Sequence, residues 1–207
     1  RAPAWMKDRE KLWNAVEKAE TRKDAQLARE IQLALPKEVS ASRQVEMLRE
    51  YVRENFVDRG MVADLAVHRD NPENPHAHVT LTMREINKDG NGFGAKNRDW
   101  NSKDRLLAWR ENWAQSVNKH LALEGHELRV DHRSYQEQGI RIEPTSKIGT
   151  RLENAQTDGR QNIQERLAEH LETARRNGER IFKDPSIALD AITHQQATFS
   201  KSEVGRW

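Results

Sequence analysis

The stretch "HAHVTLTM" at residues 76–83 constrains the fold most strongly, because polar and apolar residues alternate along it without interruption. Alternation with a period of two is typical of a β-strand with one buried and one exposed face. The two faces are His76, His78, Thr80 and Thr82 on the polar side, and Ala77, Val79, Leu81 and Met83 on the apolar side. The pattern predicts an antiparallel sheet with a covered apolar face and an open face that presents two histidines.

The neighbouring segments predict helices and further strands around this one. Helical spacing of apolar residues predicts helices over 7–22 and 43–58, the second capped by Ser40 or Ser42 and closed by Gly60. Short apolar runs at 29–36 and 61–68 predict strands, and a long helix is expected from Ser102 to Gly125. The glycine-rich segment 87–100 is expected to be a loop. We therefore expect an α+β fold, with an antiparallel sheet of about five strands in the complete domain and helices on its apolar face.

The composition excludes several classes of protein. The formal net charge is only +2, so a nucleic-acid site would have to come from a local patch of cations. The chain has no cysteine, which excludes disulfides and thiolate metal ligands and fits a reducing cytoplasm. No apolar run approaches the roughly 20 residues that a membrane-spanning helix needs, so we expect no membrane insertion.

The chain is expected to contain three parts and to belong to a longer protein, since it begins with Arg1 rather than Met. Residues 1–150 hold the sheet and its helices. Residues 151–182 are rich in charge and predict a helical linker, which would form a C-terminal helical extension. Residues 183–207 regain apolar content, as if another domain were beginning there.

Three histidines converge on the open face in the predicted sheet. His68 ends the strand at 61–68, and a seven-residue loop would bring it beside His76 and His78. A lone His-x-His pair is more often a polar surface feature than a metal site, but a third histidine at hairpin distance favours a metal. Asp64 shares a strand face with His68 and can orient an imidazole by a hydrogen bond. The remaining histidines are expected at the surface; they are His120, His126, His132, His170 and His194.

The segment "HRDNPENPHAHV" resembles the three-histidine motif of the HUH endonucleases, specifically the relaxases of the MobA/MobL type. These enzymes nick plasmid DNA at a transfer origin. Six further segments occur in the order that this family shows, namely "APAWMKDREKLWNAVEKAE", "AREIQLALPKEV", "GFGAKNRDW", "WRENWAQSVN", "DHRSYQEQGI" and "EPTSKIG". The tail "DPSIALDAITHQQATFS" resembles the junction into the helicase part of the Ti-type conjugative transfer relaxases.

The resemblance implies a set of functional residues. It assigns His68, His76 and His78 to a divalent metal, Mg or Mn, and Glu30 to an acidic position that assists the histidines or the nucleophile. It also implies a tyrosine that attacks the DNA and becomes joined to its 5′ phosphate, leaving a free 3′-hydroxyl. The family places this tyrosine near the N-terminus. The chain contains only Tyr51 and Tyr135, so we expect the nucleophile, with one or two strands of the sheet, upstream of Arg1.

Other matched positions have less defined roles. Asp131, His132 and Arg133 match the "DHRS" segment, and Glu143 and Thr145 match "EPT"; structural hydrogen bonding is expected for them. Many family members have a histidine where this chain has Lys147.

A local basic patch is predicted to bind DNA, since single-stranded DNA is held by cations that contact phosphates and flat side chains that stack on bases. The expected patch consists of Lys96, Arg98, Trp100, Lys103 and Arg105. A second, weaker patch consists of Arg129, Arg133 and Arg141.

Three functions remain open on the sequence. The first is a metal-dependent relaxase in the bacterial cytoplasm, acting on single-stranded DNA at a plasmid transfer origin together with other relaxosome or transfer proteins. The second is a DNA-binding module that keeps the scaffold without cutting. The third is a metal-dependent hydrolase of a small substrate.

Overall fold

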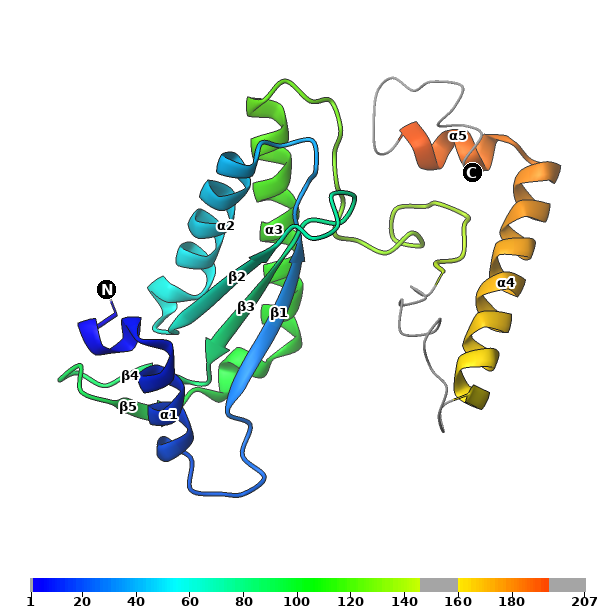
Figure 1. The fold of residues 1–207 in the computed structure, drawn as a ribbon. Coiled ribbons are helices and arrows are strands. Elements are labelled where there is room, and N and C mark those ends of the chain that lie inside the picture. Colours follow the sequence, from blue (N-terminus) through cyan, green and yellow to red (C-terminus); the bar gives the residue numbers. More distant parts are fainter. Residues whose placement is uncertain (1, 146–159, 194–207) are drawn as a thin grey trace. The chain divides into compact units, whose positions relative to one another are not determined.

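The computed structural model describes residues 2–145 and 160–193 (Figure 1). The chain divides into two compact units, residues 1–126 and residues 127–207. Every strand in the described part of the chain belongs to the first unit. Strands and helices both build this unit, which confirms the predicted α+β class.

A three-stranded antiparallel sheet forms the centre of the first unit (Figure 1). Its strands are β1 (Ala28–Ala34), β2 (Ala63–His68) and β3 (His76–Thr82), in the order β1-β3-β2. All three strands were predicted from the sequence. The register pairs His76 with His68 on one side and with Ala34 on the other. Residues that pair in this way have side chains on the same face of a sheet, so the predicted histidine face is formed by all three strands.

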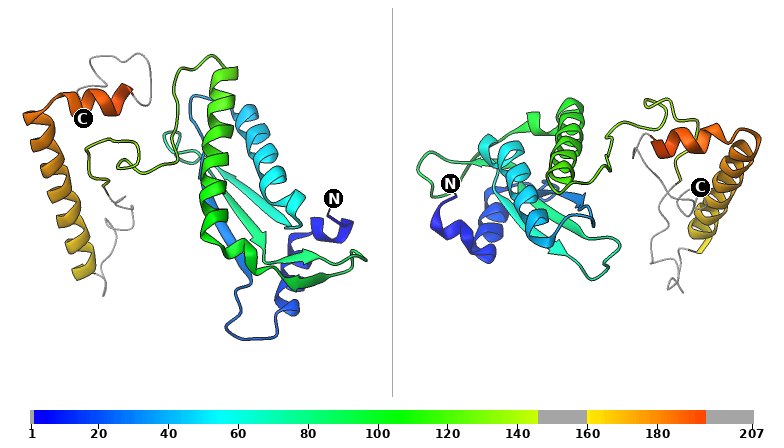
Figure 2. Two further views of the ribbon diagram at one scale, coloured as in Figure 1. Left: turned by 180° about the vertical axis from the view of Figure 1, so that it is seen from behind. Right: turned by 90° about the horizontal axis from the view of Figure 1, so that it is seen from above.

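Two helices cover the opposite, apolar face of the sheet, as predicted (Figures 1 and 2). They are α2 (Ala41–Asn55) and α3 (Lys103–Leu123). The hydroxyls of Ser40 and Ser102 cap them by accepting hydrogen bonds from backbone N–H groups in the first turn. The short helix η2 (Val57–Arg59) follows α2, and Gly60 closes it in the left-handed region at φ 94°. There an added Cβ would lie 2.9 Å from the Glu85 side chain.

The apolar face of β3 is the centre of the core. The side chains of Ala77, Val79 and Leu81 are at most 1% exposed. Thr82 corrects the sequence prediction in one respect, because it shares the histidine face by register but is 1% exposed and so is covered there. Its hydroxyl accepts a hydrogen bond from the Val62 N–H and donates one to the Arg84 carbonyl, so it joins the end of β3 to the following segment.

A second, smaller core lies where the N-terminal helices meet a two-stranded hairpin. The elements are η1 (Ala4–Lys7), α1 (Arg9–Ala19), β4 (Arg84–Ile86) and β5 (Phe93–Lys96). Met6, Leu12, Val16 and Val62 are buried in this core, and Phe93 packs against it. The expectation of a loop over 87–100 was therefore wrong for part of that segment, which contains β5 and the short helix η3 (Arg98–Asn101).

The second unit contains α4 (Arg160–Lys183) and α5 (Ser186–Thr193), preceded by an irregular segment. The Asn177 amide of α4 accepts a hydrogen bond from the Glu143 N–H at 2.9 Å and donates one to the Glu143 carbonyl at 2.8 Å. The predicted boundaries at 150 and 182 remain predictions, and part of the predicted linker lies outside the described residues. Among the helices that are described, none has the length and apolar character needed to cross a bilayer.

Candidate metal centre

The structure brings the three predicted ligands together on the open face of the sheet. One possible ligand atom from each of His68, His76 and His78 lies within 4.8 Å of the others. The ring centroids are 4.7 Å apart for His68 and His78, and 5.2 Å apart for the other two pairs. The cluster forms because His68 and His76 are register partners on β2 and β3, and His78 is the next residue on the same face of β3.

Two of the imidazoles are oriented through Nδ1. The His76 Nδ1 lies 2.9 Å from the Asn74 carbonyl oxygen, and the His78 Nδ1 is bonded to a carboxylate oxygen of Glu30 on β1. A carbonyl and an ionised carboxylate can only accept hydrogen bonds, so each Nδ1 carries the proton in this arrangement. The Nε2 lone pairs of His76 and His78 are then left to bind a metal ion.

This donor set fits a divalent metal. Neutral imidazoles are common metal ligands, and hydrogen bonds from the other ring nitrogen to a carboxylate or carbonyl are the usual outer support of such ligands. Three protein ligands leave coordination positions for water or substrate, as a catalytic rather than a structural site requires. His68 is exposed and His76 and His78 are half-buried, so solvent reaches the centre.

Asp64 does not support an imidazole, which corrects the sequence prediction. Its carboxylate accepts a hydrogen bond from Arg9 Nε at 2.7 Å and from Trp13 Nε1 at 3.1 Å, both from α1. The side chain is largely buried under these partners, with 11% exposed. The carboxylate that contacts an imidazole is that of Glu30, which is bonded to His78 Nδ1.

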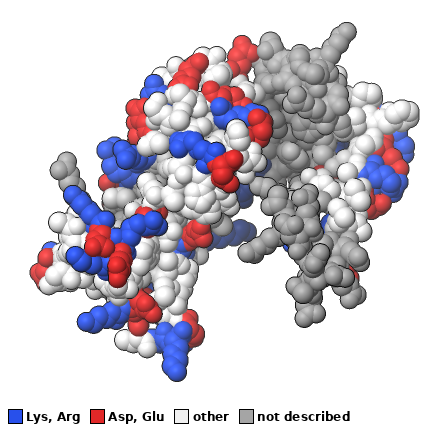
Figure 3. Space-filling view, in the orientation of Figure 1, with Lys and Arg blue, Asp and Glu red and all other residues white. Residues whose placement is uncertain are grey.

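The predicted basic patch is only partly available to DNA. The Lys96 ammonium lies 3.2 Å from Glu20 and donates to the Gln26 carbonyl at 2.7 Å. Trp100 is 4% exposed and cannot stack on a base, which corrects that expectation. Arg98 and Lys103 are exposed, and Arg105 is half-buried. Cations and anions are interspersed over the visible face of the first unit (Figure 3).

Tyr51, the tyrosine of the first unit, does not face the histidines. Tyr51 is 2% exposed, packs edge-on against Phe56 and Trp113, and donates its hydroxyl to the Trp109 carbonyl at 2.8 Å. Burial raises the pKa of the Tyr51 phenol far above its ordinary value. Tyr51 is therefore a packing residue, as its place in the predicted helix suggested.

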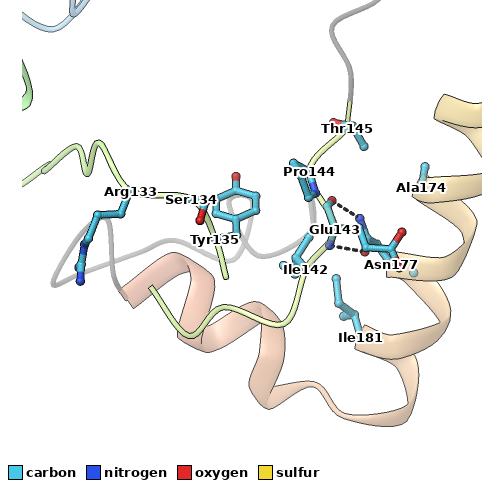
Figure 4. A pocket seen from close by; sticks show the side chains of 11 residues that line it. Arg133, Ser134, Tyr135, Ile142, Glu143, Pro144, Thr145, Ala174, Asn177 and Ile181 are labelled. Atoms are coloured by element: carbon cyan, nitrogen blue, oxygen red, sulfur yellow. Dashed lines mark hydrogen bonds between the residues drawn. The ribbon is translucent and has the colours of Figure 1, made fainter. Parts of the chain in front are cut away.

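Tyr135 belongs to the second unit, where it lines a pocket of about 520 Å³ together with Arg133, Glu143 and Thr145 (Figure 4). Arg133 pairs with Asp131 at 2.6 Å, and this contact lowers the pKa of Asp131 to about 2. Asp131, Arg133 and Glu143 thus make hydrogen bonds within the second unit, the use expected for them.

The second basic patch is engaged within its own unit. Arg129 donates to the Leu128 carbonyl at 2.7 Å, Arg133 pairs with Asp131, and Arg141 pairs with Asp184 at 2.9 Å.

The remaining matched position, Lys147, and the histidines expected at the surface have different outcomes. Lys147 and His194 lie outside the described residues. His132 and His170 are half-buried rather than fully exposed. His120 is 1% exposed in α3, so the expectation of a surface position was wrong for it. Its Nε2 lies 3.4 Å from a Glu50 oxygen, without the geometry of a hydrogen bond.

Sequence reasoning missed the residues that act through long-range contacts. The Asn74 carbonyl that orients His76 is a backbone atom, so no residue type marks it. Arg9 and Trp13 reach Asp64 across 55 and 51 residues of sequence. The only available signal was their place on one face of the predicted helix at 7–22.

The fold and the site together define an α+β protein with three clustered histidines on the open face of an antiparallel sheet. The sequence model of the MobA/MobL family matches residues 1–158. The chain therefore belongs to the MobA/MobL family, which confirms the resemblance found in the sequence.

Curated relatives carry names from plasmid transfer. The conjugal transfer protein TraA of Agrobacterium fabrum is 35% identical over 95% of this chain and 20% of its own length. The 43 kDa relaxation protein of Salmonella typhimurium is 30% identical over 67% of this chain and 44% of its own length. The chain thus spans about a fifth of the length of the Agrobacterium relative.

A solved structure reported under "Molecular Basis of Vancomycin Resistance Transfer in Staphylococcus aureus" is similar in fold. It is 40% identical, covers 65% of this chain and 72% of its own chain, and superimposes with a TM-score of 0.61.

Proposed function

We propose that this chain is the DNA-nicking part of a conjugative relaxase, which cuts one strand at a plasmid transfer origin and later rejoins it. The observation that carries the proposal is the histidine cluster, with two rings fixed through Nδ1, in a member of the MobA/MobL family. The names of the relatives support the same class of activity.

In this proposal His68, His76 and His78 hold a divalent metal, Mg or Mn. When bound, the metal would polarise an oxygen of the scissile phosphate and offset the negative charge that grows there. Glu30 holds His78 in the tautomer that leaves Nε2 free, and the carboxylate charge makes the Nε2 lone pair a stronger metal ligand.

The covalent step transfers a phosphoryl group without any net loss of phosphodiester bonds. A tyrosine oxygen bonds to phosphorus as its phenolic proton leaves, and the bond from phosphorus to the 3′ oxygen breaks. The departing 3′ oxygen takes up a proton, so the products are a 5′-phosphotyrosine and a free 3′-hydroxyl. The reverse reaction rejoins the strand, because the energy of the broken bond is kept in the new one.

We place the nucleophilic tyrosine upstream of Arg1. One observation supports this: Tyr51, the tyrosine of the first unit, is buried with its hydroxyl bonded to a backbone carbonyl. The phenol of Tyr51 would have to leave the core before it could attack a phosphate.

The proposed partner is single-stranded DNA of the transfer origin, in the bacterial cytoplasm, with other relaxosome or transfer proteins. Of the predicted basic patch we retain Arg98, Lys103 and Arg105 as phosphate contacts, since the cations of Arg98 and Lys103 are exposed. Lys96 acts instead within the fold through Glu20.

A non-cutting DNA-binding module is the second candidate. It is favoured by the absence of an accessible tyrosine beside the histidines among the described residues of the first unit. In that case the histidine cluster would still bind metal and DNA but would break no bond.

A nicking assay on supercoiled plasmid that carries the cognate origin separates these candidates. With Mn²⁺, the product of the whole gene should relax the plasmid and remain attached to a 5′ end, whereas residues 1–207 alone should bind origin DNA without cutting. A matched His76→Ala variant of the whole product should not nick. Nicking by residues 1–207 that is lost in Tyr135→Phe would overturn the upstream placement. Failure of the whole gene product to nick DNA that it binds would favour the non-cutting module.

A further inference from the structure

The three histidines differ in how their rings are held. His76 and His78 each use Nδ1 in a hydrogen bond, to Asn74 and to Glu30. Within the described part of the chain the His68 ring has no such partner, and its ring contacts are with the other two imidazoles. His68 is also the most exposed of the three. Its position therefore depends on the backbone at the end of β2.

The residue that follows His68 fixes this backbone. Arg69 donates from Nε to the Gln44 side-chain oxygen at 3.3 Å and from Nη2 to the Ala41 carbonyl at 3.2 Å. Both acceptors are at the start of α2. A guanidinium is a planar fork with fixed donor directions, so two bonds to one helix end restrict both the position and the orientation of its side chain.

Gln44 is itself immobilised. Its side chain is 4% exposed, and its amide nitrogen donates to the Pro36 carbonyl at 2.9 Å and to the Val39 carbonyl at 3.2 Å. Both polar atoms of this buried amide are therefore paired, as burial requires. Gln44 connects the segment after β1 with α2, and through Arg69 with the end of β2.

We propose that Gln44 and Arg69 form a positioning pair that sets the third metal ligand, His68. This inference rests on the proposed function, in which the histidines bind a divalent metal. Neither residue touches the ligand atoms. Asn74 and Glu30 orient His76 and His78 by hydrogen bonds to their rings. Gln44 and Arg69 instead position His68 by holding the backbone beside it.

The other end of the same loop supplies a matched control. Lys37 pairs with Glu73, and the Leu35 N–H donates to the Pro75 carbonyl at 2.9 Å. The Lys37 pair also joins the loop to the segment after β1, but it lies five residues further along the loop than His68. Lys37→Met thus removes a side-chain contact of the same loop without changing the connection at His68.

The test is calorimetric titration of Mn²⁺ into chelator-treated protein. Arg69→Met keeps an unbranched apolar stem but loses both bonds, and it should weaken binding about tenfold, at the lower end of what outer-sphere partners contribute. Lys37→Met should stay within about twofold of the wild type, as expected for a surface pair. Arg69→Lys, which retains one donor group, should fall between the wild type and Arg69→Met.

A readout without metal distinguishes positioning from general loss of structure. In NMR spectra of the metal-free protein, Arg69→Met should shift or broaden the ring Cε1–H signal of His68 and leave that of His120, which is buried in α3, unchanged. Its thermal midpoint should match that of Lys37→Met. Gln44→Met, which removes the buried amide, should change the same His68 signal.

The outcomes separate this inference from the function on which it rests. If wild type binds Mn²⁺ and His68→Ala does not, but Arg69→Met binds like wild type, the positioning role is overturned and the metal site stands. If wild type itself does not bind Mn²⁺ or another divalent ion, the metal site of the proposed function is overturned. Equal weakening in Arg69→Met and Lys37→Met would also overturn the positioning role.

Discussion

The two faces of β3 serve different purposes within a seven-residue strand. On the packed face, which α2 and α3 cover (Figure 1), Ala77, Val79 and Leu81 are at most 1% exposed. On the open face, His76 and His78 are half-buried and reach toward partners on β1, β2 and the loop before β3. Since alternate side chains point in opposite directions, stability and chemistry are carried by different residues of the same strand. Substitutions on the two faces should therefore have different consequences.

The largest expected effect is the loss of stability from a packed-face substitution. Leu81→Ala should lower the free energy of unfolding by about 2–5 kcal/mol, because it removes a buried side chain and leaves a cavity. Urea denaturation followed by circular dichroism measures this. Thr80→Ala, one residue away on the open face, is the matched control and should change the free energy of unfolding by less than about 1 kcal/mol. Equal losses in the two variants would contradict the separation of the faces.

The second effect is the reverse pattern on the open face. His76→Ala should weaken Mn²⁺ binding by more than the roughly 10- to 100-fold that the loss of an outer partner causes, since it removes a ligand. The free energy of unfolding of the metal-free protein should change by less than about 1 kcal/mol. Calorimetry and urea denaturation test both halves. A large stability loss without metal would show that the open face also supports the fold.

A third prediction concerns the pH dependence of the hairpin contact. Arg84 and then Lys96 lower the pKa of the buried Glu20 carboxyl below 4.5 in the folded protein. The pairing therefore stabilises the fold above the unfolded pKa and is lost as pH falls through the lower, folded pKa. Glu20→Gln should reduce the free energy of unfolding at pH 7 by on the order of 1 kcal/mol. The variant should also lose less of that free energy than the wild type as the pH is lowered from about 5 to about 3.

Unfolding of Glu20→Gln across that pH range provides the measurement, with the exposed Glu10→Gln in α1 as control. An unchanged pH profile in Glu20→Gln would rule out the pair as an acid-sensitive contact. Metal affinity at pH 7 should be the same in both variants, because Glu20 makes its contacts at the hairpin and not at the histidines.

The smallest expected effect is on DNA binding. Arg98→Gln should lower the magnitude of the slope of log affinity against log salt by about 0.7 for single-stranded DNA, the value for one lost phosphate contact. Fluorescence anisotropy at several salt concentrations measures the slope. Arg49→Gln, an exposed cation on α2, should leave it unchanged. A similar slope change for both would indicate a diffuse charge effect and no contact at Arg98.

The elements with regular periodicity were predictable from sequence. The alternation at 76–83 predicted β3 and its histidine face, a cap at Ser40 or Ser42 predicted the start of α2, and the pattern after Ser102 predicted α3. These signals are local, because each depends on residues that are close together in the sequence. Thr82 keeps the alternation but is buried, and its hydroxyl bonds backbone groups of Val62 and Arg84, which a period-two pattern cannot indicate.

The hairpin and the burial of Trp100 could not be predicted for a related reason. Gly90, Gly92 and Gly94 conceal the strand pattern of a hairpin whose tip is held by Trp5, 85 residues away in sequence. The Trp100 side chain is buried, and the Trp100 backbone carbonyl accepts a hydrogen bond from the Arg29 guanidinium at 2.6 Å. A basic loop that is exposed and one that is anchored to the fold can have the same composition, so composition alone does not distinguish them.

Glu30 and Asp64 illustrate how far the candidate site could be predicted. Both are acidic residues on the open face, paired with Thr80 from either side. The structure distinguishes them by their partners, since Glu30 bonds His78 and Asp64 bonds Arg9 and Trp13. Only the family resemblance favoured Glu30 beforehand. Strand periodicity gives the face of a residue but does not say which neighbour it contacts.

The all-imidazole composition of the histidine cluster has a consequence for the choice of metal. Nitrogen donors of this kind bind Ni²⁺, Cu²⁺ and Zn²⁺ more tightly than Mn²⁺, following the general order of stability for divalent ions, and they suit Mg²⁺ least. The ion present in a cell would then depend on supply as much as on the protein. Protein purified over a nickel column should therefore have its metal content measured before activity is compared between metals, because Ni²⁺ competes well for such ligands.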